Sequence, residues 1–206
     1  MYLDYKNILQ LIFPPSEDEQ IIASVQEEDF VRLMTTRCIS ETNTLLQYNN
    51  TQVRSAIHLL KFHDHAHARR LLSAVLAKYL SETIPSEYII IPVPLSKKRE
   101  RQRGYNQVTN VIKDALRTPP LYLCEQQILV RKQHTTPQTS LSREARLTNV
   151  TNAFSITNQL TASKKLAGKH ILLIDDVMTT GATLKAAKAT LLPLNPASIT
   201  CLALAH

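Results

Sequence analysis

The sequence has few of the residues on which disulfide-stapled or metal-bound folds depend. Its 206 residues include three cysteines, and no two of them have the CxxC spacing of a zinc or redox motif. An odd number of isolated cysteines gives no basis for a disulfide framework or a zinc site. We therefore expect Cys38, Cys124 and Cys201 to be reduced packing residues.

Aromatic residues are also scarce. Tryptophan is absent, and phenylalanine and tyrosine together make up 5% of the chain. Proteins that bind single-stranded nucleic acid usually stack bases on aromatic rings. The composition therefore argues against direct DNA binding, although Tyr105 lies next to the most basic segment of the chain.

Long apolar runs are missing. The first residues, MYLDYKNILQLIFPP, lack the basic start and sustained apolar run of a signal peptide, and no stretch approaches the length of a membrane span. With 44% hydrophobic residues over 206 positions, the chain can bury a full core. We expect a cytoplasmic protein with one main domain.

Residues 170–183, HILLIDDVMTTGAT, have the order of a phosphosugar site. The apolar run 171–174 is short and rich in β-branched residues, which favours a strand buried on both faces of a parallel sheet. Asp175 and Asp176 follow directly. In open α/β sheets, ligands bind beyond the carboxyl ends of the strands. The two carboxylates are therefore predicted to lie at a ligand site.

A small, hydroxyl-rich loop comes next. Thr179, Thr180 and Thr183 offer hydroxyl groups, Gly181 allows a tight turn, and a helix is expected from about residue 183 to 192. The positive end of that helix suits a phosphate. Carboxylates repel phosphate but accept hydrogen bonds from sugar hydroxyls, so the whole pattern indicates a ribose 5-phosphate. The alternative is an ordinary buried strand with an acidic turn and a threonine-capped helix.

The positive charge of the chain is concentrated in its middle. Residues 97–146 contain eleven basic and four acidic side chains, whereas the rest of the chain contains thirteen of each. Such a concentration suits a pyrophosphate or a nucleic-acid backbone. It is equally what a solvated basic face looks like in sequence.

A second buried strand, residues 88–93, leads into this basic segment. Residues 94–107, PLSKKRERQRGYNQ, place five Lys or Arg side chains within seven positions and then Gly104, ahead of a helix that carries Val108, Val111 and Ile112. If this strand neighbours the Asp175 and Asp176 strand, cations and sugar-binding carboxylates lie at adjacent strand ends.

Other segments complete an α/β fold with a central, mostly parallel sheet flanked by helices. Apolar periodicity predicts helices around residues 53–60 and 71–80, and further strands at 153–156 and 198–203. His63, His65 and His67 between the helices are better explained as a polar connector than as a metal site. Residues 131–152 suit a long functional loop, in which Arg143 and Arg146 are candidates to meet phosphate oxygens, or else a disordered excursion.

The first 50 residues differ from the rest. Residues 1–47 contain eight carboxylates and three basic side chains and show poor periodicity. Ser16 followed by Glu19 is typical of a capping box at the start of a helix. We predict an acidic, helical appendage over residues 1–50, joined to a main domain over residues 51–206.

The segment from Leu172 to Thr183 resembles the fingerprint of the type I phosphoribosyltransferases, a hydrophobic strand, two acidic residues and a T-T-G-x-T loop. The resemblance implies binding of phosphoribosyl pyrophosphate. Asp175 and Asp176 would contact the ribose 2- and 3-hydroxyls, and the following loop would surround the 5-phosphate. The loop residues are Val177, Met178, Thr179, Thr180, Gly181, Ala182 and Thr183.

Two further blocks narrow the resemblance to the competence protein F (ComF, GntX-like) branch of this superfamily. Residues 89–107 are similar to its P-V-P-L, basic run and R-G-[FY]-N-Q signature, which implies a pyrophosphate site. The residues concerned are Leu95, Ser96, Lys97, Arg103 and Gly104. Residues 131–154 resemble its third block, with Arg131, Thr135 or Thr136, Gln138, Leu141, Arg146, Asn149 and Phe154 in the pattern. Members of the branch usually carry zinc-binding CxxC knuckles, which this sequence lacks.

The resemblance implies a role in DNA uptake during natural transformation, with Mg²⁺ held mainly by oxygens of the phosphoribosyl pyrophosphate itself. Single-stranded DNA and other uptake proteins are the implied partners. The alternative is a catalytic phosphoribosyltransferase of nucleotide metabolism that transfers ribose 5-phosphate to a base or amine and releases pyrophosphate. No residue stands out as a general base, so the sequence identifies neither a catalytic residue nor the acceptor.

Overall fold

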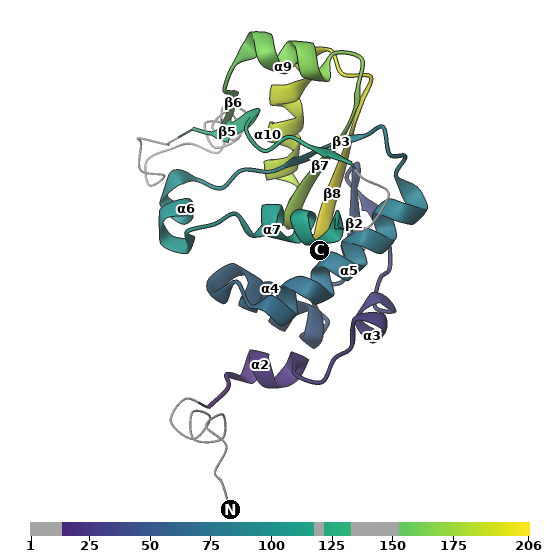
Figure 1. Ribbon diagram of the computed structural model, residues 1–206, viewed down its shortest axis with the longest axis vertical. Coiled ribbons are helices and arrows are strands. Elements are labelled where there is room, and N and C mark those ends of the chain that lie inside the picture. The colour runs from purple at the N-terminus through teal and green to yellow at the C-terminus, as the bar shows by residue number, and fades with distance from the viewer. Residues whose placement is uncertain (1–13, 118–121, 133–152) are drawn as a thin grey trace, which may run out of the picture.

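The computed structural model describes residues 14–117, 122–132 and 153–206. Its centre is a six-stranded sheet of order β1-β2-β8-β7-β3-β4, in which all neighbours are parallel except β1 and β2 (Figure 1). These strands are β1 Arg37–Ile39, β2 Thr42–Leu46, β3 Ile89–Pro92, β4 Leu123–Cys124, β7 His170–Val177 and β8 Ser198–Ala205. The predicted mostly parallel α/β fold is confirmed.

Helices cover both faces of the sheet. They are α2 Glu17–Ile22, α3 Glu27–Val31, α4 Thr51–His63, α5 Ala66–Thr83, α6 Lys97–Arg103, α7 Gln107–Ala115, α9 Gln159–Leu166 and α10 Ala182–Leu191, with a 3-10 turn at Leu192–Leu194. Alternate residues of β7 enter different cores. Leu172 and Ile174 pack with α4, α5 and α7, whereas Ile171 and Leu173 pack with α9 and α10. Burial on both faces explains why this strand is a continuous apolar run.

The amino-terminal part of the described chain is more than a helical segment. Ser16 caps α2 and forms the predicted capping box with Glu19. Beyond α3, however, β2 pairs in parallel with β8 and so belongs to the central sheet. Phe30 of α3 is fully buried in the same core as α4 and α5. The division of the chain at residue 50 stays a prediction, but the residues on its two sides share one core.

The predicted strand at residues 153–156 forms outside the central sheet. β6 Phe154–Ile156 pairs antiparallel with β5 Leu129–Arg131 in a separate two-stranded sheet. Its contacts with α10 place this small sheet on the α9 and α10 side of the molecule. β5 ends at Arg131, which lies beside the end of the central sheet and lines the cavity described below.

The histidine-containing connector is short. α4 ends at His63, Asp64 adopts a left-handed conformation, and His65 caps the start of α5. Over the described ranges, no three histidine, cysteine or carboxylate side chains are grouped so that they could hold a metal ion. Over the same ranges, none of the helices is long and apolar enough to span a membrane.

Candidate functional site at the carboxyl ends of β3 and β7

The two predicted site strands are neighbours. β3 and β7 pair in parallel with Ile90 opposite Leu172 and Pro92 opposite Ile174, so their carboxyl ends meet at one edge of the sheet. Beyond β3 the chain turns through Pro94 and Leu95 into α6, and beyond β7 it turns into α10. The expectation that the carboxylates and the basic segment follow adjacent strands is confirmed.

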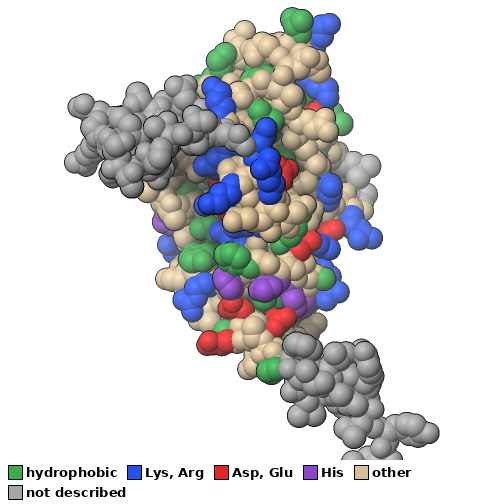
Figure 2. Space-filling view, turned by 90° about the vertical axis from the view of Figure 1, so that its left-hand side faces the viewer, with side chains coloured by type: hydrophobic (Ala, Val, Ile, Leu, Met, Phe, Trp, Pro, Cys, Tyr) green, Lys and Arg blue, Asp and Glu red, His purple; other side chains and the backbone are tan. Residues whose placement is uncertain are grey.

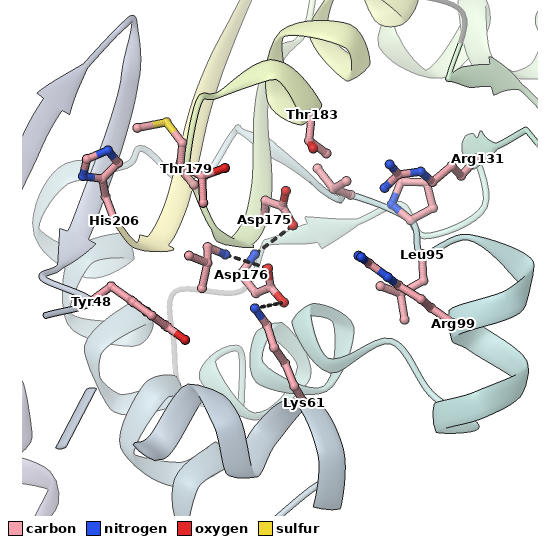
Figure 3. Close-up of a pocket in the computed structure, with 14 residues that line it drawn as sticks. Tyr48, Lys61, Leu95, Arg99, Arg131, Asp175, Asp176, Thr179, Thr183 and His206 are labelled. Atoms are coloured by element: carbon pink, nitrogen blue, oxygen red, sulfur yellow. Dashed lines mark hydrogen bonds and ion pairs between the residues drawn. The ribbon is translucent and has the colours of Figure 1, made fainter. Parts of the chain in front are cut away.

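A cavity of about 620 Å³ opens at this edge. Asp175 and Asp176 lie at its centre, with Thr179 and Thr183 on the β7 to α10 side (Figure 3). Arg99 and Arg131 border it from one side, and Tyr48 and His206 from the opposite side. The remaining wall consists of Lys61, Val93, Pro94, Leu95, Val177 and Met178.

Asp176 is held by contacts from three directions. Its Oδ1 accepts a hydrogen bond from the Val177 N–H at 2.6 Å, and its Oδ2 accepts one from the Gln107 amide at 2.7 Å. The Lys61 ammonium lies 3.3 Å from the same Oδ2. A cation and two hydrogen-bond donors thus fix the position of the Asp176 side chain.

Asp175 has a different environment. Burial raises its pKa from the ordinary 3.8 to about 7, and the neighbouring charge of Asp176 adds to the rise. The Asp176 N–H, which donates to Asp175 Oδ1 at 2.9 Å, and the more distant Lys61 and Arg131 charges act against it. The acidic pair therefore combines a carboxylate that is held by three contacts with a buried carboxyl group whose pKa is raised.

Two arginines, Arg99 and Arg131, form the cationic side of the cavity among the described residues. Among the residues that the structure describes, neither Arg99 nor Arg131 forms an ion pair with a carboxylate. Burial lowers the pKa of Arg131, and the charge of the nearby Arg99 lowers it further. Two guanidinium groups that face one cavity, and that form no ion pair with any described carboxylate, suit an anionic ligand.

The predicted phosphate loop divides between two cavities. Val177, Met178, Thr179 and Thr183 line the large cavity, together with the acidic pair. Thr180 and Gly181 instead border a smaller cavity of about 380 Å³ that also contains Lys185 and Lys188. Gly181 has φ +74° and immediately precedes α10, where Ala182 is the first residue. The glycine is needed there because other residues rarely adopt that conformation.

The residues predicted for pyrophosphate are less closely grouped. Leu95 lines the large cavity, and with Lys97 and Gly104 it also lines an adjoining cavity of about 450 Å³. Ser96 caps α6 by accepting the Arg99 N–H. The Arg103 guanidinium lies 5.5 Å from the centre of the Phe62 ring. Thus the structure brings Leu95 to the acidic pair, but neither Lys97, Arg103 nor Gly104 lines the same cavity.

Several residues of the cavity were not predicted as site residues. Arg99 belongs to the basic run and Arg131 opens the third block, so both had a signal in the sequence. Lys61, Tyr48 and His206 come from α4, from the β2 to α4 turn and from the residue after β8, where no pattern marked them. The loop candidates Arg143 and Arg146 lie outside the described residues.

The carboxyl-terminal part of the chain is similar to a known domain family. The model of the phosphoribosyl transferase domain family matches residues 124–206, which include the acidic pair and the threonine loop. Over these residues the chain is similar to phosphoribosyl transferase domains. Among solved structures it is similar to an orotate phosphoribosyltransferase of Mycobacterium tuberculosis, with 10% identity, a TM-score of 0.38, and coverage of 91% of this chain and 82% of that one. A likeness so distant carries no information about function.

Curated relatives confirm the resemblance to the competence protein F branch. The chain is 35% identical over 124 residues to competence protein F of Haemophilus influenzae, and 36% identical over 123 residues to competence protein ComFC of Streptococcus pneumoniae. These matches cover 59% of this chain and 51% and 50% of the relatives. DNA utilization protein YhgH of Salmonella typhi is 32% identical over 136 residues, covering 62% of this chain and 55% of that protein. The chain spans about half the length of these relatives.

Proposed function

We propose that the large cavity binds phosphoribosyl pyrophosphate. Asp175 and Asp176 accept hydrogen bonds from the ribose 2- and 3-hydroxyls, and residues 177–183 surround the 5-phosphate. The pyrophosphate then extends toward Leu95, Arg99 and Arg131. The observation that carries this proposal is the division of one cavity into a carboxylate and hydroxyl side and a cationic side whose two arginines form no ion pair among the described residues.

Magnesium would enter with this ligand. Asp176 already accepts hydrogen bonds from Val177 and Gln107 and pairs with Lys61, so the protein offers few free carboxylate positions for a metal of its own. A cation carried by the pyrophosphate oxygens would neutralise part of the phosphate charge, which fits a site that two arginines border within the described part of the chain.

The two halves of the site can be tested separately by calorimetric titration with phosphoribosyl pyrophosphate and Mg²⁺, and with ribose 5-phosphate. The wild type should bind the pyrophosphate ester more tightly. The double variant Arg99→Met with Arg131→Met should lose most of this preference and keep its affinity for ribose 5-phosphate. Arg101→Met, an exposed arginine on the same helix, is the matched control. An undiminished preference in the double variant would contradict the assignment.

We further propose that the protein acts in DNA uptake, because its relatives are named competence protein and DNA utilization protein. Lys and Arg side chains gather in the middle of the face that α6 occupies (Figure 2). α6 contributes Lys97, Lys98 and Arg101 to it, all exposed. A surface of this kind suits the backbone of single-stranded DNA and gives binding that weakens as salt increases.

The DNA contact is measured by fluorescence anisotropy of a labelled oligonucleotide over a series of salt concentrations. Replacing Lys97, Lys98 and Arg101 by alanine should weaken binding and reduce the slope of log affinity against log salt by about 2, since each lost contact contributes about 0.7 for a single strand. Replacing Lys164 and Lys169, on and just after α9, is the control. Equal slopes in the wild type and the α6 variant would rule out this surface.

A catalytic phosphoribosyltransferase is the second candidate. The cavity of about 450 Å³ shares Pro94, Leu95 and Arg131 with the proposed ligand cavity, so an acceptor bound there would lie next to the pyrophosphate ester. The carboxyl of Asp175, whose pKa is raised to about 7, is placed to exchange a proton at neutral pH. Release of pyrophosphate in the presence of a nucleobase or amine would support this function, and its absence with a full set of bases would exclude those acceptors.

A further inference from the structure

A short segment that joins α6 to α7 contacts both α4 and the acidic pair. This RGYNQ segment, residues 103–107, runs from the last residue of α6 to the first residue of α7. On one side, the Tyr105 hydroxyl donates a hydrogen bond to the Leu60 carbonyl at 3.0 Å, and Arg103 lies over the Phe62 ring. On the other side, Gln107 donates to Asp176. The segment therefore contacts both neighbours of Lys61 in the chain as well as the carboxylate that Lys61 faces.

The segment is itself firmly attached to the end of β3. The Asn106 amide donates to the Val93 carbonyl at 3.0 Å, and its oxygen accepts from the N–H groups of Val108 and Thr109 at the start of α7. Gly104 adopts φ +75° at the end of α6, a conformation that favours glycine. These contacts fix where Tyr105 and Gln107 lie relative to the sheet.

Gln107 is committed to Asp176. Gln107 is buried, with 1% of its surface exposed. Within the described residues, its amide oxygen has no hydrogen-bond partner. A buried amide with an unpaired oxygen costs stability. The hydrogen bond that this side chain does form is the one to Asp176 Oδ2 at 2.7 Å, so the conformation of Gln107 serves the acidic pair.

Lys61 completes the arrangement. Its side chain is 22% exposed and that of Asp176 is 14% exposed, so their contact at 3.3 Å is largely shielded from water. A partly buried lysine with four rotatable bonds keeps one position only where its surroundings hold it. Here the turn of α4 that carries Lys61 is held by Tyr105 and Arg103.

We propose that Lys61 is a positioning residue for the sugar site, and that the RGYNQ segment holds it against Asp176. The segment thus acts on the ribose side of the cavity, through α4 and Gln107, rather than on the pyrophosphate. This inference rests on the proposed binding of phosphoribosyl pyrophosphate. It adds Lys61 of α4 to that site. It also gives the RGYNQ segment a role in positioning Lys61, in addition to the phosphate binding that the neighbouring basic residues suggest.

Two substitutions at Lys61 test the proposal. Lys61→Met removes the charge and keeps most of the side-chain volume, and it should weaken binding of phosphoribosyl pyrophosphate with Mg²⁺ by about 30-fold, as expected for the loss of one partner of a shielded charge pair. Lys61→Arg should restore part of the affinity. Tyr105→Phe should weaken binding by about fivefold, through the loss of one hydrogen bond to α4. Lys78→Met, in an exposed ion pair with Glu82 on α5, is the control.

A second measurement needs no ligand. The carboxyl carbons of Asp175 and Asp176 are followed by NMR over a pH series in the wild type and in Lys61→Met. Removing the Lys61 cation, which lowers the pKa of Asp175, should move the titration of Asp175 to higher pH, whereas Arg99 and Arg131 and the rest of the cavity stay the same. Lys78→Met should leave the titration unchanged.

The outcomes separate the two proposals. If the wild type does not bind phosphoribosyl pyrophosphate but the carboxyl titration moves in Lys61→Met, the proposed ligand is wrong and the role of Lys61 beside Asp176 stands. If the wild type binds and Lys61→Met binds equally well with an unchanged titration, the role of Lys61 is overturned. An arginine variant that binds no better than the methionine variant, at equal thermal stability, would also overturn it.

Discussion

Replacing Asp175 by asparagine should make the protein more stable at neutral pH. Burial and the neighbouring Asp176 raise the pKa of Asp175 to about 7, whereas an aspartate in an unfolded chain has a pKa of about 3.9. Between these two values the folded protein keeps a proton that the unfolded chain has lost. The free energy of unfolding of the wild type therefore falls as the pH rises through this window.

The magnitude follows from the difference between the two pKa values. Each unit corresponds to about 1.4 kcal/mol, so the full difference of about three units corresponds to at most about 4 kcal/mol at pH 8. Asparagine has nearly the same shape, stays neutral, and retains an oxygen to accept the Asp176 N–H, which lies 2.9 Å from Asp175 Oδ1. Its contribution should not vary with pH.

The assay is urea unfolding of both proteins at several pH values from 4.5 to 8, followed by circular dichroism. The two stabilities should be similar at the acidic end, and the advantage of Asp175→Asn should grow toward pH 8. Subtracting one curve of stability against pH from the other cancels the contribution of groups that titrate alike in both proteins. A difference that stays constant across this range would refute the assignment of a protonated carboxyl to Asp175.

Three further substitutions test the surrounding structure by thermal unfolding. Gly181→Ala should lower stability by about 1 to 2 kcal/mol, because φ +74° at the start of α10 disfavours a side chain, and a wild-type melting temperature would contradict the geometry of the loop. Ser16→Ala should cost about 1 kcal/mol through loss of the capping box, while the exposed Ser24→Ala should have no effect. Tyr122→Phe should lower the free energy of unfolding by about 1 to 2 kcal/mol, since the single proton of the buried hydroxyl is shared between the Leu80 and Ile84 carbonyls at 2.8 and 2.6 Å. An unchanged stability would show that those carbonyls do not depend on it.

The sequence predicted the parts of the fold that are governed by local patterns. The apolar run before Asp175 is buried on both faces. A strand that packs against a core on each face must be apolar at every position. The periodicity of α4 and α5 follows from one apolar face on each helix. Ser16 and Glu19 form the predicted capping box, because that contact depends only on residues three positions apart.

The remaining features depend on contacts between distant segments. β2, with the sequence TNTLL, has little alternation and becomes a strand by pairing with β8, in which each partner residue lies 159 positions later in the chain, as from Thr42 to Cys201. The same applies to the site. Lys61 reaches Asp176 because Tyr105 and Gln107 hold the two elements together, and Arg131 reaches the cavity because β5 pairs with β6 away from the main sheet. No spacing within one segment encodes such contacts.

Ligand titration of a variant that lacks both carboxylates of the acidic pair tests most directly whether the cavity binds phosphoribosyl pyrophosphate. Purified protein is titrated calorimetrically with phosphoribosyl pyrophosphate and Mg²⁺, beside the double variant Asp175→Asn with Asp176→Asn and beside Asp29→Asn, an exposed aspartate on α3 that pairs with Arg32. We expect saturable binding by the wild type and by Asp29→Asn, and loss of that binding in the folded double variant. Equal binding by the double variant, or no binding by a folded wild type, would contradict this expectation.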